Sequence, residues 1–350
     1  MIRSYKFIST EHSKLHEFVI NFFKRCETNI DGFNEFLFDP EFWPIVTRHK
    51  KILRSEFEKI YQYLCDLSQD DRSAFIQELI ESNEIEVICK GEKKPKKLDN
   101  KCNGIEKVIR DLFINLYSQV LDGKPFQSVL NITLKQHFDE FSNANHDITL
   151  CPICGIGELK KAEDDCRDQY DHYLPKALYP FSSVNFYNLV PCCRECNSLE
   201  VKGEKDIVED FTGKLFFPYD ETHKGIELQV NIKQDAEEVK NIDWVFHFIN
   251  SDDKVDEIVS WKGIYNIEGR YQGYVKARIK KWYNSYFEYL KNPKLKHLSL
   301  EDRKLTYIGV LEEDEKEGLN FIRRPVLDSF FSESVIVQAE LEAMEYQLIV

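Results

Sequence analysis

The sequence lacks any long uninterrupted run of apolar side chains. A helix that crosses a bilayer needs about 20 consecutive apolar residues, and no stretch of the 350-residue chain approaches that length. The opening residues, MIRSYKFISTEHSK, also lack the apolar core that a secretory signal requires. We therefore expect a protein that has no membrane partner and works in the cytoplasm.

Internal repeats and low-complexity tracts are absent too, and positive charge is scarce. The chain carries 47 basic and 61 acidic side chains, a formal net charge of −14, so it is not expected to bind a polyphosphate over its whole surface. Its apolar fraction of 42% excludes a mostly disordered chain, and its length allows a substantial core without disulfide bonds.

One segment runs against this acidic background. Residues 270–296 hold eight basic side chains and a single acid, Glu288. Two interpretations stay open. The segment is a helix whose basic face follows phosphates, with Tyr274 or Tyr283 available to stack on bases. Alternatively, its basic face pairs with the acidic residues of 297–350.

Hydrophobic patterning divides the chain into three predicted domains. Residues 1–149 show apolar side chains at helical spacing and form a helical N-terminal domain. Residues 150–215 replace that periodicity with cysteines and short β-type runs. Residues 216–350 begin with alternating segments, IELQVNI and WVFHFI, and continue with helices. The predicted fold class is therefore α+β, mostly helical, with a small β segment.

Six of the ten cysteines crowd into residues 151–196, which is a metal-site pattern rather than a disulfide pattern. Cys151 and Cys154 form one Cys-x-x-Cys pair, and Cys193 and Cys196 form another. Two such pairs can close a tetrahedral cage of thiolates around a structural Zn²⁺. A closed four-cysteine zinc has no open coordination position, so any catalysis must come from other residues.

Two further cysteines in this segment were weighed as ligands. Cys192 adjoins Cys193, but only Cys193 has a partner at Cys-x-x-Cys spacing. Cys166 has no partner at motif spacing, which favours a small buried apolar side chain. A thiol redox protein would instead use one Cys-x-x-Cys pair as a reactive dithiol, and zinc retained under mild oxidant would count against it.

The residues between and after the cysteine pairs carry a resemblance to a known family. The run D-H-Y-L-P at 171–175, followed by N-L-V-P-C-C-R-E-C-N at 188–197, resembles the HNH endonucleases. Their ββα-metal core is often held together by two Cys-x-x-Cys pairs. The resemblance covers about residues 150–205 and implies an embedded zinc-stapled HNH core.

The resemblance also implies a role for each matching residue. His172 corresponds to the general base that takes a proton from the attacking water. Asp171 corresponds to a ligand of a catalytic Mg²⁺ or Mn²⁺. Asn188 corresponds to the asparagine that holds a loop and so orients the histidine. Asn197 stands at the last position, often a histidine in the family, and would complete the metal site. Glu200 stands where the family commonly has a lysine.

These residue types also fit phosphodiester hydrolysis on chemical grounds. A neutral imidazole accepts a water proton near pH 7, and a hard cation held by a carboxylate and an amide binds phosphate oxygens. Asp171 and His172 are adjacent, so we expect a bend or bulge that lets both reach one phosphate. Arg194, Lys176 and Lys202 are candidate phosphate contacts.

The sequence therefore predicts a nuclease acting on DNA or RNA. The alternative is a non-catalytic zinc module that binds nucleic acid or a protein partner. HNH proteins with large additional segments resemble bacterial restriction and anti-phage effectors, some of which act beside an ATPase. A companion ATPase and a role in antiviral defence are expectations by that analogy alone.

Overall fold

The computed structural model describes residues 2–99, 101–160, 170–316 and 321–349. About 54% of the chain is helical and 7% is in strands, so the prediction of a mostly helical α+β protein is confirmed. Cys166, for which a buried apolar environment was predicted, lies outside the described residues. None of the described helices has both the length and the apolar character that a bilayer crossing requires.

The chain packs into two compact units. The first, here called the helical unit, comprises Ser4–His146 and Lys160–Glu221. The second, here called the C-terminal unit, comprises Met1–Arg3, Asp147–Leu159 and Thr222–Val350. The predicted division into domains 1–149, 150–215 and 216–350 stays a prediction, because compact packing does not by itself establish which segments fold independently.

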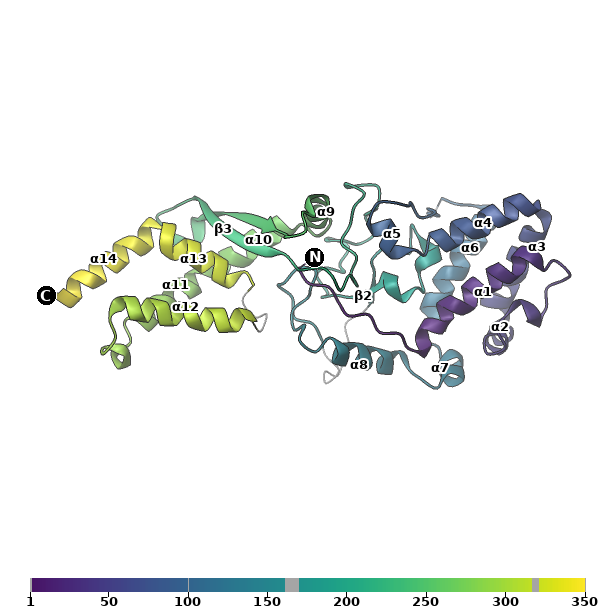
Figure 1. The fold of residues 1–350 in the computed structure, drawn as a ribbon, viewed down its shortest axis with the longest axis horizontal. Helices are drawn as coiled ribbons and strands as arrows, with labels where there is room; N and C mark the ends of the chain where they lie inside the picture. The colour runs from purple at the N-terminus through teal and green to yellow at the C-terminus, as the bar shows by residue number, and fades with distance from the viewer. Residues whose placement is uncertain (1, 100, 161–169, 317–320, 350) are drawn as a thin grey trace. The chain divides into compact units, whose positions relative to one another are not determined.

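The helical unit is built from short amphipathic helices. In α1, residues Leu15, Phe18 and Phe22 follow helical spacing and are all buried. Helices α1, α3, α4 and α6 lie against one another, as Figure 1 shows. The helices of this unit are α1 Lys14–Thr28, α2 Trp43–Arg48, α3 Ser55–Asp66, α4 Gln69–Glu81, α5 Ile85–Cys89, α6 Gly104–Asn115, α7 Lys124–Leu130 and α8 Leu134–Ala144.

Local signals in the sequence explain where some of these elements begin. The Thr10 hydroxyl accepts the amide N–H of His12 at 3.3 Å and caps a 3₁₀ turn, Glu11–Ser13, that leads into α1. Thr133 and Gln136 form a reciprocal capping box at the start of α8. Short π-helical segments, Lys50–Arg54 and Leu116–Val120, stand next to α3 and α6.

One hydrophobic core joins these helices to the segment that carries the Asp-His dipeptide. Tyr170, Phe181, Val184, Phe186 and Leu189 are buried in the same cluster as the apolar faces of α1, α3 and α6. The Phe181 ring lies 5.3 Å from that of Phe113, edge to face. The N-terminal helices therefore share one hydrophobic core with this segment.

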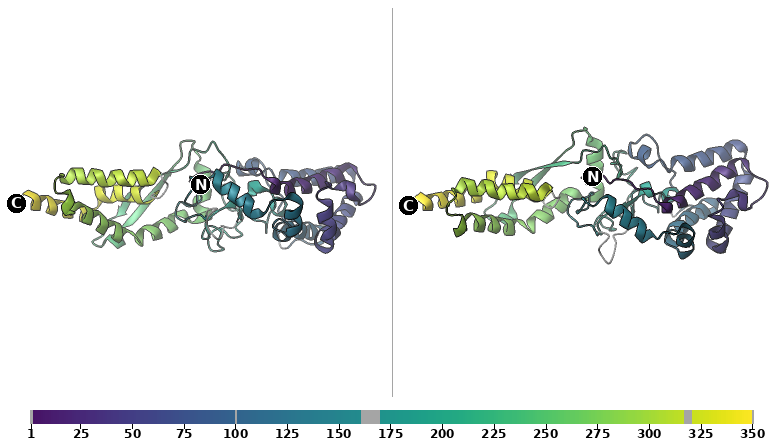
Figure 2. Two further views of the ribbon diagram at one scale, coloured as in Figure 1. Left: turned by 90° about the horizontal axis from the view of Figure 1, so that it is seen from below. Right: turned by 60° about the horizontal axis from the view of Figure 1, so that its bottom comes forward.

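In its described residues, the C-terminal unit contains a two-stranded antiparallel ribbon and six α-helices. Strand β3, Glu227–Gln234, pairs with β4, Asp243–Ile249, with an irregularity between Ile232 and Gln234. Helix α13 packs along β3, which is visible in Figure 2. The helices are α9 Val255–Tyr265, α10 Ile267–Lys276, α11 Ile279–Leu290, α12 Leu300–Lys316, α13 Arg323–Glu333 and α14 Val335–Ile349.

The basic segment 270–296 forms two helices, α10 and α11, rather than one. Its apolar side chains are buried as the helical spacing predicts, including Tyr271, Val275 and Tyr286. Its basic side chains lie largely at the surface. Lys291 pairs with Glu340 at 2.6 Å, so at least one basic group of the segment is bonded to the acidic flank.

Candidate functional site

The four cysteines of the two Cys-x-x-Cys pairs form one buried cluster. The Sγ atoms of Cys151, Cys154, Cys193 and Cys196 all lie within 4.8 Å of one another. A tetrahedral zinc with Zn–S bonds of about 2.3 Å places its sulfurs about 3.8 Å apart, which fits this cluster. The predicted four-cysteine group that could hold a structural metal such as zinc is therefore present. Cys192 is buried but stands outside it.

The first cysteine pair sits in a tight turn that the surrounding chain holds in place. Gly155 donates its amide to the Cys151 carbonyl at 2.7 Å and has a φ of +64°, where side chains are disfavoured. The Trp261 indole donates to the Ile153 carbonyl at 2.6 Å, and the Tyr271 hydroxyl donates to the Cys154 carbonyl at 2.8 Å. Two aromatic side chains from α9 and α10 thus orient the ligand-bearing backbone.

The Asp-His dipeptide lies on a short hairpin in the helical unit. Strand β1, Tyr170–His172, pairs antiparallel with β2, Leu189–Pro191, and Asp171 faces Val190 across the ladder. The register is regular, so the expected bulge is absent from the paired residues. The chain instead bends directly after His172, where β1 ends.

Asn188 holds the loop that follows β1. Its side-chain oxygen accepts the Leu174 amide at 2.6 Å, and its Nδ2 donates to the Leu174 carbonyl at 3.1 Å and the Ser182 carbonyl at 3.2 Å. The side chain is fully buried, so each of these bonds satisfies a group that has no access to water. The backbone between His172 and Ser183 is tied to one asparagine.

A cavity of about 560 Å³ opens beside the hairpin. Asp171, His172 and Asn197 all line it, together with Lys176 and Lys202. Three of the four residues assigned to the reaction by resemblance therefore share one cavity, and the fourth, Asn188, lies behind its wall. Arg194 is exposed and is not among the described residues that line this cavity.

Asp171 has a buried carboxylate in which one oxygen accepts a hydrogen bond and the other has no hydrogen-bond partner among the described residues. Its side chain is only 5% exposed. Oδ1 accepts a bond from the Lys202 ammonium at 2.9 Å, while Oδ2 has no hydrogen-bond partner among the described residues. Burial raises the pKa of Asp171, and the positive charge of Lys202 opposes that rise. An unsatisfied buried carboxylate oxygen is costly, and a bound cation would satisfy it.

His172 is held in one tautomer. Its Nε2 lies 3.0 Å from the Ser183 carbonyl, which can only accept, so Nε2 carries the proton. Nδ1 is then the acceptor nitrogen of a neutral ring. Burial, together with the charges of Lys176 and Lys202, lowers the pKa of His172 well below its ordinary value. The Tyr117 ring contacts the imidazole edge to face with centroids 4.2 Å apart.

The lysines of the cavity have different environments. Lys202 is 1% exposed and bonds both Asp171 and the His172 carbonyl, the latter at 2.6 Å. Lys176 is half-buried, its ammonium lies 5.0 Å from the centre of the Tyr117 ring, and burial lowers its pKa. Lys176 is the more accessible of the two for an anion that enters the cavity.

The third element of the expected ββα core is not a helix. After β2 the chain makes consecutive turns, with Ser198 bonded to Glu195 and Val201 bonded to Ser198 through backbone groups three residues apart. Gly203 has a φ of +51°, and a Cβ there would lie 2.9 Å from the Leu199 carbonyl oxygen. A residue with left-handed backbone conformation ends a helix. Asn197 lies in the turns that precede Gly203 and not in a helix.

Three contacts of this site had no motif signal in the sequence. They are the Ser183 carbonyl under His172, the Tyr117 ring against it, and the ion pair of Lys202 with Asp171. Ser183 and Tyr117 come from segments with no chemical motif. Lys202 was considered only as a phosphate contact, because its distance of 31 residues from Asp171 gives no hint of a pair.

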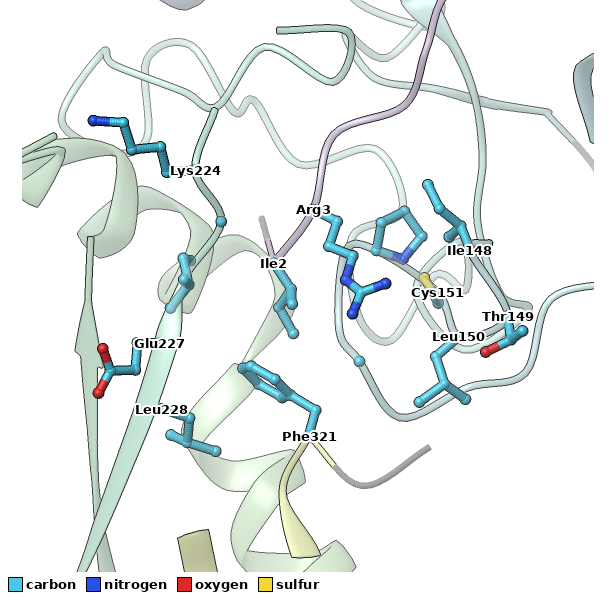
Figure 3. A pocket seen from close by; sticks show the side chains of 14 residues that line it. Ile2, Arg3, Ile148, Thr149, Leu150, Cys151, Lys224, Glu227, Leu228 and Phe321 are labelled. Atoms are coloured by element: carbon cyan, nitrogen blue, oxygen red, sulfur yellow. The ribbon is translucent and has the colours of Figure 1, made fainter. Parts of the chain in front are cut away.

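A second cavity, of about 240 Å³, lies in the C-terminal unit beside the first cysteine pair. Figure 3 shows Ile2, Leu150, Leu228 and Phe321 on its walls, with Arg3 reaching along one side. Among the described residues that line it there is no histidine, and its charged side chains are those of Arg3, Lys224 and Glu227.

Comparisons with known proteins add little to this geometry. No protein-family model and no solved structure matches the chain. The chain is similar to protein ea31 of Escherichia phage lambda, with 43% identity over 77 residues, or 22% of this chain. The match spans only 19% of the phage protein, so it shows a shared segment and no family.

Proposed function

We propose that this chain is an HNH-type endonuclease that hydrolyses phosphodiester bonds in DNA or RNA with the help of a divalent cation. The observation that supports this most is that Asp171, which has one carboxylate oxygen without a hydrogen-bond partner among the described residues, and His172, which has an acceptor nitrogen, line the same cavity. Hydrolysis needs a base for water and a cationic environment for the phosphate, and this cavity supplies both.

The proton acceptor in this proposal is Nδ1 of His172. The Ser183 carbonyl holds the opposite nitrogen, and the low pKa keeps the ring neutral at cytoplasmic pH. The loop bonds of Asn188 fix the backbone on both sides of that contact. Asp171 and Lys202 line the same cavity but are bonded to each other, so neither of these two is proposed as the proton acceptor.

A Mg²⁺ or Mn²⁺ fits the oxygen donors that line the cavity. Asp171 offers Oδ2, and Asn197 offers a neutral amide oxygen from the neighbouring turn. When bound, such a cation stabilises negative charge on the phosphate and on the leaving oxygen. Lys176 lines the same cavity and can bind a non-bridging phosphate oxygen.

The four-cysteine cluster has a structural role in this proposal. Four thiolates leave a zinc ion no open position, so the metal stabilises the chain around the site and takes no part in the reaction. A companion ATPase and an anti-phage role are consistent with the resemblance and form part of the proposal only as expectations about partners.

The test is a cleavage assay with the purified zinc-loaded chain, Mg²⁺ or Mn²⁺, and labelled duplex DNA, single strands and structured RNA. We expect cleavage by the wild type and a loss of about 100-fold or more in His172→Ala, because a general base contributes about 10²–10⁴ in rate. His247→Ala replaces an exposed histidine on β4 and serves as the control that keeps activity.

Zinc content of His172→Ala should match that of the wild type, and thermal unfolding should show that the variant is folded at the assay temperature. Cleavage by His172→Ala at the wild-type rate would remove His172 from the reaction. Absence of cleavage of every substrate, with or without added cell lysate, would favour the non-catalytic zinc module that binds nucleic acid or a protein partner. The ion pair of Lys202 with Asp171 favours that alternative, because it already neutralises the carboxylate.

A further inference from the structure

The charges around Asp171 are unusual for a cation site. Two ammonium groups, those of Lys202 and Lys176, act on this one carboxylate. Glu204 acts on Lys176, whereas Lys202 is buried and faces Asp171 directly. Apart from Asp171 itself, the two charged groups that act on this carboxylate are therefore both positive before any cation binds.

From this arrangement we propose that Lys202 keeps the divalent-cation site weak until a phosphodiester anion enters the cavity, so that cation and nucleic acid bind cooperatively. The inference rests on the proposed function and concerns the same cavity. It assigns Lys202 a role as a positioning residue that acts through Asp171, instead of the phosphate contact considered from the sequence.

The geometry explains how one lysine does this. The Lys202 ammonium is anchored twice, at 2.9 Å from Asp171 Oδ1 and at 2.6 Å from the His172 carbonyl. Oδ2 is the carboxylate oxygen that has no hydrogen-bond partner among the described residues, and it is therefore the oxygen left to bind a cation in this proposal. The same ammonium repels a cation that binds Oδ2. The two positive charges would then sit at the two oxygens of one carboxylate, away from bulk water, where their repulsion is poorly screened.

A phosphodiester removes that penalty. It brings a negative charge and two non-bridging oxygens, which add ligands to a hard cation and reduce the net positive charge from Lys176 and Lys202. Mg²⁺ sites in proteins commonly use one or two carboxylates together with substrate phosphates. A site with a single carboxylate that is already paired with a lysine is therefore expected to bind Mg²⁺ or Mn²⁺ weakly when the substrate is absent.

The experiment measures Mn²⁺ binding by the full-length, zinc-loaded chain in the His172→Ala background, which keeps an oligonucleotide intact. Free Mn²⁺ is followed by its electron paramagnetic resonance signal, with and without short DNA and RNA oligonucleotides. We expect an oligonucleotide to raise the Mn²⁺ affinity by about tenfold, within the 5–150-fold range of typical coupled sites. By reciprocity, Mn²⁺ must raise the oligonucleotide affinity by the same factor.

The variant that tests Lys202 is Lys202→Met, with Lys94→Met as the matched control. Lys94 is an exposed lysine of the same unit. Removal of the buried ammonium should raise the Mn²⁺ affinity of the chain alone by about tenfold and reduce the gain from the oligonucleotide. The control should change neither. Because Lys202→Met leaves a buried carboxylate unpaired, zinc content and thermal unfolding are measured alongside.

If Lys202→Met does not fold, Lys176→Met provides a second test, because Lys176 is only half-buried and also acts on Asp171. Lys176→Met is expected to raise the Mn²⁺ affinity of the chain alone as well, but by less than Lys202→Met. Unchanged or weaker Mn²⁺ binding in the folded variants would overturn the role of Lys202. So would tight Mn²⁺ binding by the chain alone that no oligonucleotide improves.

These results separate the inference from the proposed function. Cleavage by the wild type together with oligonucleotide-independent Mn²⁺ binding would leave the endonuclease standing and reject cooperative binding. Absence of both Mn²⁺ binding and cleavage under every condition would reject the two together.

Discussion

At the scale of single residues, the site depends on buried polar groups whose partners are almost all provided by backbone. Asn188 and Ser183 act on the loop and ring of His172 without reaching the cavity themselves. Such residues transmit their effects through geometry, because a buried amide or carbonyl without a partner forces the backbone to move. Their replacement therefore reports on orientation rather than on chemistry.

We expect Asn188→Ala to lower the free energy of unfolding by about 2–4 kcal/mol, since it leaves several buried backbone groups of Leu174 and Ser182 unpaired. It should also lower cleavage far more than the fraction of folded protein falls, because His172 loses its fixed position. Chemical denaturation and cleavage rates measured at the same temperature separate the two effects.

The matched control is Asn185→Ala. Asn185 is also buried, but its side chain bonds Asn83 and Tyr187 instead of the loop behind His172. A similar loss of stability with cleavage retained is expected. If both variants lose cleavage equally, Asn188 has no specific part in orienting the histidine.

At the scale of elements, the cysteine turns are the pieces whose conformation depends most on a ligand. Trp261 and Tyr271 donate hydrogen bonds to backbone carbonyls of the turn at 151–154. Gly155, the residue after this turn, has a left-handed backbone conformation. Four buried cysteine sulfurs converge within 4.8 Å of one another, and this cluster could hold a structural metal such as zinc.

Cys193→Ser should lower both the zinc content, from about one ion per chain, and the midpoint of thermal unfolding. Cys192→Ser changes the adjacent buried cysteine, which stands outside the cluster, and should leave the zinc content unchanged. Elemental analysis and differential scanning calorimetry measure both quantities. Equal zinc content in the two variants would contradict the assignment of Cys193 as a ligand.

At the scale of the whole molecule, the distribution of charge matters more than its sum. The chain carries −14 overall, yet α10 and α11 present exposed lysines, of which Lys276 and Lys281 have no ion-pair partner among the described residues. Arg278 lies over the Tyr274 ring at 3.8 Å, which places a cation and an aromatic face together. This surface is consistent with a local contact to nucleic acid and leaves the acidic remainder outside that contact.

We expect the double variant Lys276→Gln/Lys281→Gln to weaken oligonucleotide binding and to reduce the slope of log affinity against log salt by about 1–2, as loss of two phosphate contacts requires. Fluorescence anisotropy titrations at several salt concentrations measure the slope. The control Lys233→Gln/Lys240→Gln removes two exposed lysines that already pair with Asp243 and Glu238. An equal change in both double variants would show a general charge effect instead of a surface on α10 and α11.

Much of the fold class and the chemistry could be predicted from short-range patterns. Helical spacing marked the buried faces of α1 and α11, alternation marked β3 and β4, and the Cys-x-x-Cys spacing marked the metal cluster. Spacing fails where a local break intervenes. The single helix predicted for the basic segment 270–296 is divided between Lys276 and Ile279, and the helix expected after β2 is replaced by turns around Gly203.

The sequence by itself determined which residue types are available for chemistry: the two cysteine pairs, the Asp171-His172 dipeptide and the asparagines that follow. These are encoded by neighbours along the chain, whose spacing is set by covalent geometry. Tertiary structure alone decided that Lys202 neutralises Asp171, that Ser183 selects the tautomer of His172, and that residues 170–189 share one core with the N-terminal helices. Those contacts join segments distant in sequence, and only burial of apolar surface brings them together.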